Sequence, residues 1–249
     1  MKPMLSLLAT SAIILSAGLA NAAEINVAVA ANFTDAATDI AKAFEAETGD
    51  TVLLSFGSTG KLYTQIANGA PFTVFLAADQ ARAKKAVDEG FAVAGSEFTY
   101  AIGKLVLFSE DADLVDADGA VLKAPDGFSK IAIANPTAAP YGSAAVETMK
   151  SLGLYETLEP KIVQGDSISQ TFQFVATGNA ELGFVALSQV IGEDSGSKWV
   201  VPADLYSPIA QDAVLTNKGA DDETSKAFLE FLKGDKAEAI IASYGYATE

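Results

Sequence analysis

The sequence predicts an α/β protein in which mixed, mainly parallel sheets are flanked by helices. Two observations lead to this fold class. Short apolar runs of strand length alternate with segments in which apolar residues recur every three or four positions, a pattern typical of βα units. Half of the 249 residues are hydrophobic and 19% are charged, so the chain can form a large buried core and is not expected to be generally disordered.

The N-terminal segment, residues 1–22, has the organisation of a secretory signal peptide. Lys2 precedes an apolar stretch centred on Leu5 to Leu19, and the segment closes on the small residues of Ala20-Asn21-Ala22. The alternative is a membrane anchor, but the apolar stretch is short for a span of ~20 residues. We therefore expect cleavage after Ala22 and export to the periplasm.

Six strands are expected in the rest of the chain, each a short apolar run or an apolar alternation. They cover residues 24–30, 51–56, 74–77, 105–109, 130–135 and 182–187.

Helices are expected between these strands and at the C-terminus. In the first of them Ala37, Ile40 and Phe44 share one face, whereas Asp35 and Lys42 face water. The predicted helices cover residues 33–47, 62–68, 82–89, 143–152, 170–177, 222–232 and 236–244.

Composition excludes several classes of site. The chain has no Cys and no His, which rules out disulfides, thiolate nucleophiles, imidazole metal ligands and catalytic triads with a histidine base. Asp and Glu (32) outnumber Lys and Arg (16), and the net charge of −16 argues against nucleic-acid binding. We do not expect an enzyme, although a secreted hydrolase that uses carboxylates stays open as an alternative.

Small or hydroxylated residues recur where a predicted strand passes into a predicted helix. A helix N-terminus has unpaired N–H groups and about half a positive charge, so several of them around one cleft would bind an anion without a cationic side chain. Four segments show the pattern: Ala30-Ala31-Asn32, Gly57-Ser58-Thr59-Gly60, Pro140-Tyr141-Gly142-Ser143 and Asp166-Ser167-Ile168-Ser169.

Each segment also has an ordinary structural interpretation. Asn32 is a favoured helix N-cap, and Asp166 is interpreted as a cap as well, because a carboxylate in an anion cleft would repel the ligand. Tyr141 and Ile168 would be surface and core residues. The glycine-bracketed turn around Ser58 lacks the second half of a nucleotide-binding loop.

Four longer segments resemble the periplasmic molybdate/tungstate-binding proteins of ABC transporters, and the similarity extends in order over the whole mature chain. The resemblance implies a two-lobed type II periplasmic solute-binding fold, with a ligand cleft between the lobes in which neutral donors enclose one tetrahedral oxyanion. The segments are Val27-Ala28-Val29-Ala30-Ala31-Asn32-Phe33-Thr34, Ser55-Phe56-Gly57-Ser58-Thr59-Gly60-Lys61-Leu62, Val74-Phe75-Leu76-Ala77-Ala78-Asp79 and Phe231-Leu232-Lys233-Gly234.

The resemblance also implies the ligand contacts. Asn32 stands where the family contributes side-chain and backbone N–H donors, and Thr59 matches a hydroxyl contact for which Ser58 is a close competitor. Tyr141 stands where members offer a backbone N–H or a tyrosine, and Ile168 where the backbone N–H of an apolar residue is the contact.

One departure concerns Ala186, where some members have a tyrosine. We expect the Tyr141 hydroxyl to replace the missing one from the opposite wall.

The organisation implied by the resemblance is a signal peptide and two lobes. Lobe 1 comprises residues 23–103 and 204–249, and lobe 2 comprises residues 104–203, so the chain crosses the cleft twice. The expected ligand is molybdate or tungstate, with no cofactor and no metal bound other than as the oxyanion. The expected partner is a membrane ABC permease, and the protein is expected to be a monomer. A binder of sulfate or another oxyanion, and a sensor domain that reports oxyanion, are the open alternatives.

Overall fold

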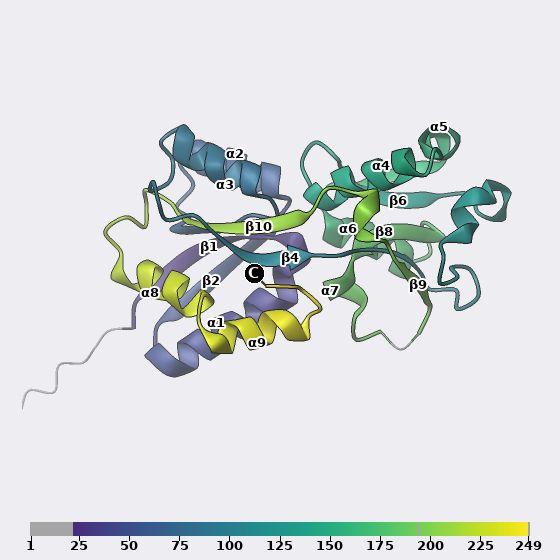
Figure 1. The fold of residues 1–249 in the computed structure, drawn as a ribbon. Helices are drawn as coiled ribbons and strands as arrows, with labels where there is room; N and C mark the ends of the chain where they lie inside the picture. The colour runs from purple at the N-terminus through teal and green to yellow at the C-terminus, as the bar shows by residue number, and fades with distance from the viewer. Residues whose placement is uncertain (1–21, 194, 249) are drawn as a thin grey trace, which may run out of the picture.

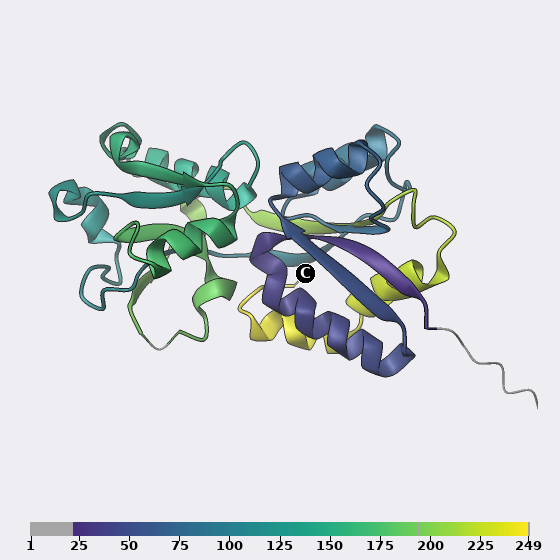
Figure 2. The same ribbon diagram turned by 180° about the vertical axis from the view of Figure 1, so that it is seen from behind.

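The computed structural model describes residues 22–193 and 195–248, which form two α/β halves (Figures 1 and 2). The predicted signal peptide, residues 1–22, lies outside this part except for its last residue. Within the described residues, the structure has no helix with the length and apolar character needed to span a membrane.

The first half is built on a five-stranded sheet in the order β2-β1-β3-β10-β4. The three neighbours β2, β1 and β3 are parallel, whereas β10 pairs antiparallel with both β3 and β4. The strands are β1 (Glu24–Ala30), β2 (Thr51–Gly57), β3 (Val74–Leu76), β4 (Phe98–Gly103) and β10 (Ile209–Leu215).

The second half repeats this pattern of pairing in the order β7-β6-β8-β5-β9. Here β7, β6 and β8 are parallel, and β5 pairs antiparallel with β8 and β9. The strands are β5 (Leu105–Ser109), β6 (Ile131–Ala134), β7 (Ile162–Gly165), β8 (Leu182–Ala186) and β9 (Ser197–Val200).

The predicted α/β class with mixed sheets is confirmed. Antiparallel pairs are as numerous as parallel pairs among the named strands, because β4, β9 and β10, which the apolar pattern did not predict, all pair antiparallel. The short strand β7 was missed as well.

Helices cover both faces of each sheet (Figure 1). In the first half α1, α8 and α9 pack on one face through Phe44, Phe228 and Ile241, and α2 and α3 pack on the other through Leu62 and Ala83. The helices are α1 (Thr34–Thr48), α2 (Thr59–Ala67), α3 (Gln80–Asp88), α8 (Glu223–Leu232) and α9 (Asp235–Ser243), with the 3₁₀ turn η1 (Ala31–Phe33) leading into α1.

In the second half α4 packs on one face of the sheet through Ala145 and Met149, and α6 packs on the other through Val175. The helices are α4 (Pro140–Ser151), α5 (Tyr155–Leu158), α6 (Ile168–Ala176) and α7 (Leu187–Val190), with 3₁₀ turns η2 (Ala120–Lys123), η3 (Pro125–Gly127), η4 (Glu159–Lys161) and η5 (Ala203–Leu205).

The helices that follow strands β2, β3, β6 and β7 begin two or three residues earlier than the apolar pattern predicts. The pattern places their starts at residues 62, 82, 143 and 170, whereas α2, α3, α4 and α6 begin at Thr59, Gln80, Pro140 and Ile168. First turns are often formed by small or polar residues whose N–H groups are unpaired, so hydrophobic periodicity does not mark them.

The chain passes between the two sheets twice. β4 ends at Gly103 in the first sheet and β5 begins at Leu105 in the second, and the chain returns between Val200 of β9 and Ile209 of β10. Gly103 lies at the first crossing, where an added Cβ would be 2.1 Å from the hydroxyl oxygen of Tyr141. A side chain therefore does not fit at this position.

Candidate functional site

The structure brings all five candidate residues to one small cavity between the two halves. None of the residues that line the cavity is charged. The first half contributes Ala30, Ala31, Asn32, Gly57, Ser58, Thr59 and Ala78, and the second half contributes Ala139, Pro140, Tyr141 and Ile168.

Helix starts surround this cavity. Thr59 and Ile168 are the first residues of α2 and α6, Tyr141 is the second residue of α4, and Asn32 lies in the turn η1 that leads into α1. The first N–H groups of a helix have no acceptor within the helix, and the helix dipole makes this end positive. An anion in the cavity would therefore meet positive backbone ends from both halves.

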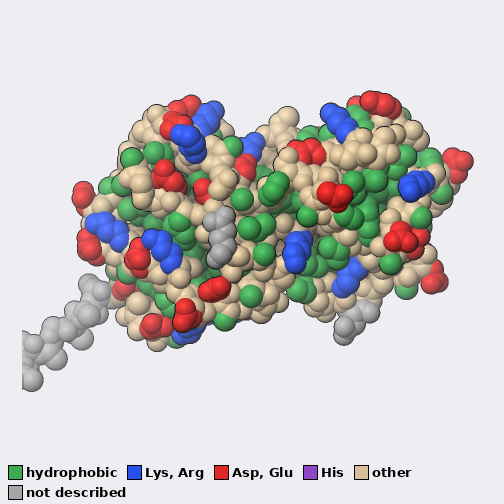
Figure 3. Space-filling view, viewed as in Figure 1, with side chains coloured by type: hydrophobic (Ala, Val, Ile, Leu, Met, Phe, Trp, Pro, Cys, Tyr) green, Lys and Arg blue, Asp and Glu red, His purple; other side chains and the backbone are tan. Residues whose placement is uncertain are grey.

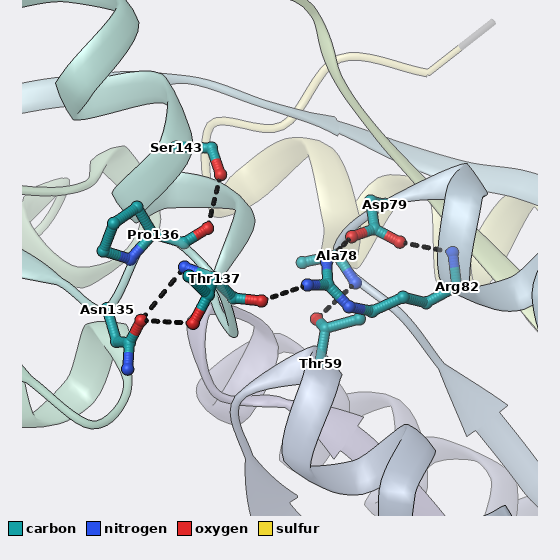
Figure 4. Close-up of polar contacts among 8 residues, drawn as sticks. All are labelled: Thr59, Ala78, Asp79, Arg82, Asn135, Pro136, Thr137 and Ser143. Carbon is teal, nitrogen blue, oxygen red and sulfur yellow. Dashed lines mark hydrogen bonds and ion pairs between the residues drawn. The ribbon is translucent and has the colours of Figure 1, made fainter.

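Ser58 and Thr59 differ in how their hydroxyls are used. The Ser58 side chain is buried, and its Oγ has no hydrogen-bond partner among the described residues. Thr59 Oγ1 instead accepts the backbone N–H of Ala78 at 3.0 Å (Figure 4). Of these two hydroxyls, only that of Ser58 is without a partner in the described chain.

The Tyr141 hydroxyl is also buried and has no hydrogen-bond partner in the described chain. It lies against Gly103 at the first crossing between the halves. Burial, aided by the neighbouring Tyr246 and Tyr100, raises the pKa of Tyr141 well above 10, so the hydroxyl keeps its proton at neutral pH.

Asn32 is buried and is held by side chains from two distant segments. Its Nδ2 donates to Oε1 of Gln211 at 2.8 Å and to the hydroxyl of Tyr246 at 3.0 Å. Its backbone carbonyl accepts from Tyr246 at 2.7 Å and from Ser188 at 2.9 Å.

The interpretation of Asn32 as a helix N-cap is wrong. The cap position of α1 is Phe33, and neither η1 nor α1 has a side-chain cap hydrogen bond. The Asn32 side chain turns to Gln211 and Tyr246 instead of to the first turn of the helix. The interpretation of Asp166 as a cap is wrong too, because Ser167 accepts the N–H of Gln170 at the start of α6.

Three neighbours of the site were not predicted from the sequence: Gln211, Tyr246 and Ser188. Gln211 is fully buried in β10, a strand that was not predicted. The signal that could have found it is the pair of polar residues, Gln211 and Asp212, within the otherwise apolar stretch from Ile209 to Leu215.

Hydrogen bonds and an ion pair join the two halves around the cavity. The Gly60 N–H donates to the Ala138 carbonyl at 2.9 Å, and the Ser169 hydroxyl donates to the Ala31 carbonyl at 3.1 Å. Lys61 pairs with Asp166 at 2.8 Å on the surface.

Arg82 makes a further contact between the halves. Its guanidinium donates to the backbone carbonyl of Thr137, and the Asp79 carboxylate holds the same guanidinium (Figure 4). Direct contacts between the halves thus lie on several sides of the cavity.

Charged side chains are interspersed on the face of the molecule drawn in Figure 3, with acidic and basic groups close to one another. Within residues 22–193 and 195–248 no group of three or more Asp and Glu side chains is placed to hold a metal ion. The chemistry that the arrangement supports is the binding of a small anion by neutral donors.

A model of the family described as bacterial extracellular solute-binding protein matches residues 25–247. The chain belongs to this family. The solute-binding protein is 59% identical over 230 residues to the molybdate-binding protein ModA of Rhodobacter capsulatus, with 92% of this chain and 90% of the relative covered. It is 55% identical over 242 residues to the ModA of Azotobacter vinelandii, with 94% and 96% covered.

Solved structures agree with these relatives. The periplasmic molybdate-binding protein of Azotobacter vinelandii matches this solute-binding protein with a TM-score of 0.87 and 43% identity, over 90% of this chain and 99% of that one. The sulfate-binding protein SubI of Mycobacterium tuberculosis has a TM-score of 0.76 over 90% of this chain and 86% of that one, and at 13% identity it shares the fold alone.

Proposed function

We propose that this chain captures molybdate, or the similar oxyanion tungstate, in the cavity between the two halves and delivers it to a membrane ABC permease. The observation that carries the proposal is a small cavity with an uncharged lining, surrounded by helix starts from both halves. Relatives named as molybdate-binding proteins, 55% and 59% identical over more than nine tenths of this chain, support molybdate as the ligand.

The proposed contacts are divided between the halves. Asn32, Ser58 and Thr59 act from one side, and Tyr141 and Ile168 act from the other. A fully deprotonated oxyanion accepts hydrogen bonds only, and every one of these residues offers an N–H or O–H donor. We propose Ser58 as the hydroxyl contact, because its Oγ is buried without a partner.

At Tyr141 the backbone N–H is proposed as the contact. It belongs to the first turn of α4, whereas the hydroxyl lies against Gly103. From the sequence, the hydroxyl was predicted to contact the ion in place of the tyrosine missing at Ala186; we propose the N–H instead.

Selectivity follows from the size of the cage. Molybdate and tungstate are larger than sulfate, so in a cage sized for them sulfate would lose contact with several donors. Each lost hydrogen bond to a charged group costs about 1.5–3 kcal/mol, and two or three would discriminate by orders of magnitude. Molybdate and tungstate are too similar in size to be separated in this way.

The proposed organisation is a periplasmic monomer whose signal peptide is cleaved after Ala22. Lobe 1 comprises residues 23–103 and 204–249, and lobe 2 comprises residues 104–203; the two crossings act as hinges for closure around the ion. Hydrolysis is not proposed, because the cavity lining contains no carboxylate to act as nucleophile or base.

Calorimetric titration and thermal unfolding, each carried out with molybdate, tungstate, sulfate and phosphate, test the proposal. At one hundred times its dissociation constant, molybdate or tungstate should stabilise the native state by about 2.7 kcal/mol. For a chain of this size that corresponds to a rise in Tm of roughly 5–11 °C. Equal shifts with sulfate and molybdate would refute the selectivity, and no shift with any of the four ions would refute oxyanion binding.

A further inference from the structure

The side-chain NH₂ of Asn32, a proposed donor to the ion, donates to other protein groups in this structure. Its Nδ2 donates to Gln211 and Tyr246 inside the protein, and the described residues supply no donor to its Oδ1. An amide oxygen would repel an anion, whereas an amide nitrogen would bind it. Binding of an oxyanion by this side chain therefore requires the opposite orientation.

The neighbouring Gln211 has a buried side-chain nitrogen that lacks a hydrogen-bond acceptor among the described residues. The residue is fully buried, and its Oε1 accepts from Asn32 at 2.8 Å while its Nε2 has no hydrogen-bond partner among the described residues. Buried amide nitrogens without a partner are rare, because the lost hydration is not replaced.

We propose that Gln211 is a positioning residue for the ion site: with ion bound, its Nε2 donates to Oδ1 of Asn32, and Nδ2 of Asn32 faces the ion. The two ends of an amide have nearly the same shape, so half-turns of both side chains exchange N and O without moving the neighbours. The 2.8 Å contact between Asn32 and Gln211 is kept with donor and acceptor exchanged. The inference rests on the proposed function.

Tyr100 favours this arrangement. Its hydroxyl lies 3.1 Å from the Ala77 carbonyl and 3.3 Å from Oε1 of Gln211, and one proton cannot serve both acceptors. After the exchange Tyr100 donates to Ala77 and accepts from Nε2 of Gln211, so both protons of that nitrogen have partners.

Tyr246 adjusts at the other side of Asn32. Its hydroxyl now accepts from Nδ2 of Asn32, and after the exchange it donates to Oδ1 across the same 3.0 Å. The backbone carbonyl of Asn32 then keeps Ser188 as its donor at 2.9 Å. The exchange gives up the 2.7 Å hydrogen bond from Tyr246 to that carbonyl. In return both protons of Gln211 Nε2 gain acceptors, while Oε1 takes the position that the nitrogen leaves.

A double-mutant cycle on molybdate affinity tests the inference, with Asn32→Ala, Gln211→Met and the double variant. Each single substitution should raise the molybdate Kd about tenfold to hundredfold, and the double variant should bind no more weakly than Asn32→Ala alone. The matched control is Gln164→Met on the exposed face of β7, which should leave the Kd unchanged. An unchanged Kd in Gln211→Met, or additive effects in the cycle, would overturn the inference.

A second measurement uses the wild-type protein and does not depend on the folding of a variant. In the ¹⁵N–¹H spectrum the side-chain NH₂ signals of Asn32, assigned by their loss in Asn32→Ala, should shift strongly on addition of molybdate. Signals that stay in place while molybdate binds would overturn the inference and leave the proposed function standing. If the wild-type protein binds no oxyanion in calorimetry, the proposed function itself fails.

Discussion

Arg82 in α3 donates to the backbone carbonyl of Thr137 at 2.5 Å and so joins the two halves beside the cavity (Figure 4). Asp79, which caps α3 by accepting the Arg82 N–H at 2.8 Å, also pairs with the guanidinium. The arginine is therefore oriented by its own helix before it reaches the other half. We call Asp79, Arg82 and Thr137 the latch.

Removal of the latch should favour opening. Arg82→Met retains most of the stem and loses the charge-assisted hydrogen bond to Thr137, so the closed state should lose about 1 kcal/mol and the molybdate dissociation rate should rise about fivefold. Stopped-flow displacement measures this rate. Lys84→Met on the same helix removes an exposed ion pair with Asp88 and serves as the control. Equal rates for the two variants would contradict a role of the latch in closure.

Ser58→Ala should weaken ion binding without harming the fold. The Ser58 hydroxyl has no partner in the described chain, so its removal breaks no internal hydrogen bond, whereas the ion loses one donor worth about 1.5–3 kcal/mol. The molybdate Kd should rise more than tenfold while the Tm of the ligand-free protein stays constant. Calorimetry and thermal unfolding measure the two quantities. A loss of Tm with unchanged Kd would show that Ser58 is structural.

Thr59→Val should lower stability more than it weakens ion binding, in contrast to Ser58→Ala. Thr59 Oγ1 accepts the buried N–H of Ala78, and valine would leave this donor unsatisfied at a cost of about 1–3 kcal/mol. The free energy of unfolding should fall by this amount in urea titrations, with a smaller effect on the Kd than Ser58→Ala has. The prediction fails if Thr59→Val affects affinity more than stability.

Gly142→Ala should destabilise the protein and displace the start of α4. A Cβ at this position would lie 2.1 Å from the backbone carbonyl oxygen of Ala134, so either the helix or β6 must move. Overpacking of this kind costs about 1–3 kcal/mol, and the shift should misplace the Tyr141 N–H and raise the molybdate Kd. Gly127→Ala is the matched control, because nothing lies within 4 Å of a Cβ there. Thermal unfolding and calorimetry should separate the two variants.

Stability should decrease at alkaline pH. Burial, with the hydrogen bond to Glu89, raises the pKa of Tyr63 to about 12, and the hydrogen bond to Asp39 raises the pKa of Tyr244 to about 12. The unfolded tyrosines ionise near pH 10, so the unfolded state loses protons first and stability falls as the pH rises from 10 to about 12. The Tm measured between pH 8 and 12 should show this decrease, and Tyr244→Phe should reduce it. A constant Tm above pH 10 would contradict the prediction.

The local order of strands and helices could be predicted from the sequence, because it depends on the spacing of apolar residues along the chain. The predicted bounds of β1 and β5 agree with the structure to the residue, and each predicted helix has a counterpart shifted by a few residues at most. Strands β4, β7, β9 and β10 were missed. Apolar residues do alternate in β4 at Phe98, Tyr100 and Ile102, whereas Gln211 and Asp212 interrupt the apolar run of β10. All four strands pair with strands elsewhere in the chain.

The segments around the cavity could be predicted for the same local reason, whereas the choice of individual residues within them came from the resemblance to the molybdate/tungstate-binding family. Asn32, Ser58, Thr59, Tyr141 and Ile168 all lie where a strand gives way to a helix, and the carboxyl ends of parallel strands meet at one edge of a sheet. Small and hydroxylated residues at such junctions are visible in the sequence without knowledge of any contact.

Only the tertiary structure decided which hydrogen-bond partners these side chains have. The Asn32 side chain donates to Gln211 and Tyr246, which are 179 and 214 positions away in the chain. The Thr59 hydroxyl accepts the N–H of Ala78, whereas the Ser58 hydroxyl has no partner among the described residues. A hydrogen bond depends on distances of about 3 Å between groups that only the folded chain brings together. The sequence by itself therefore determined which helix starts could bind an anion, and the packing of the two halves decided which donors remain free to do so.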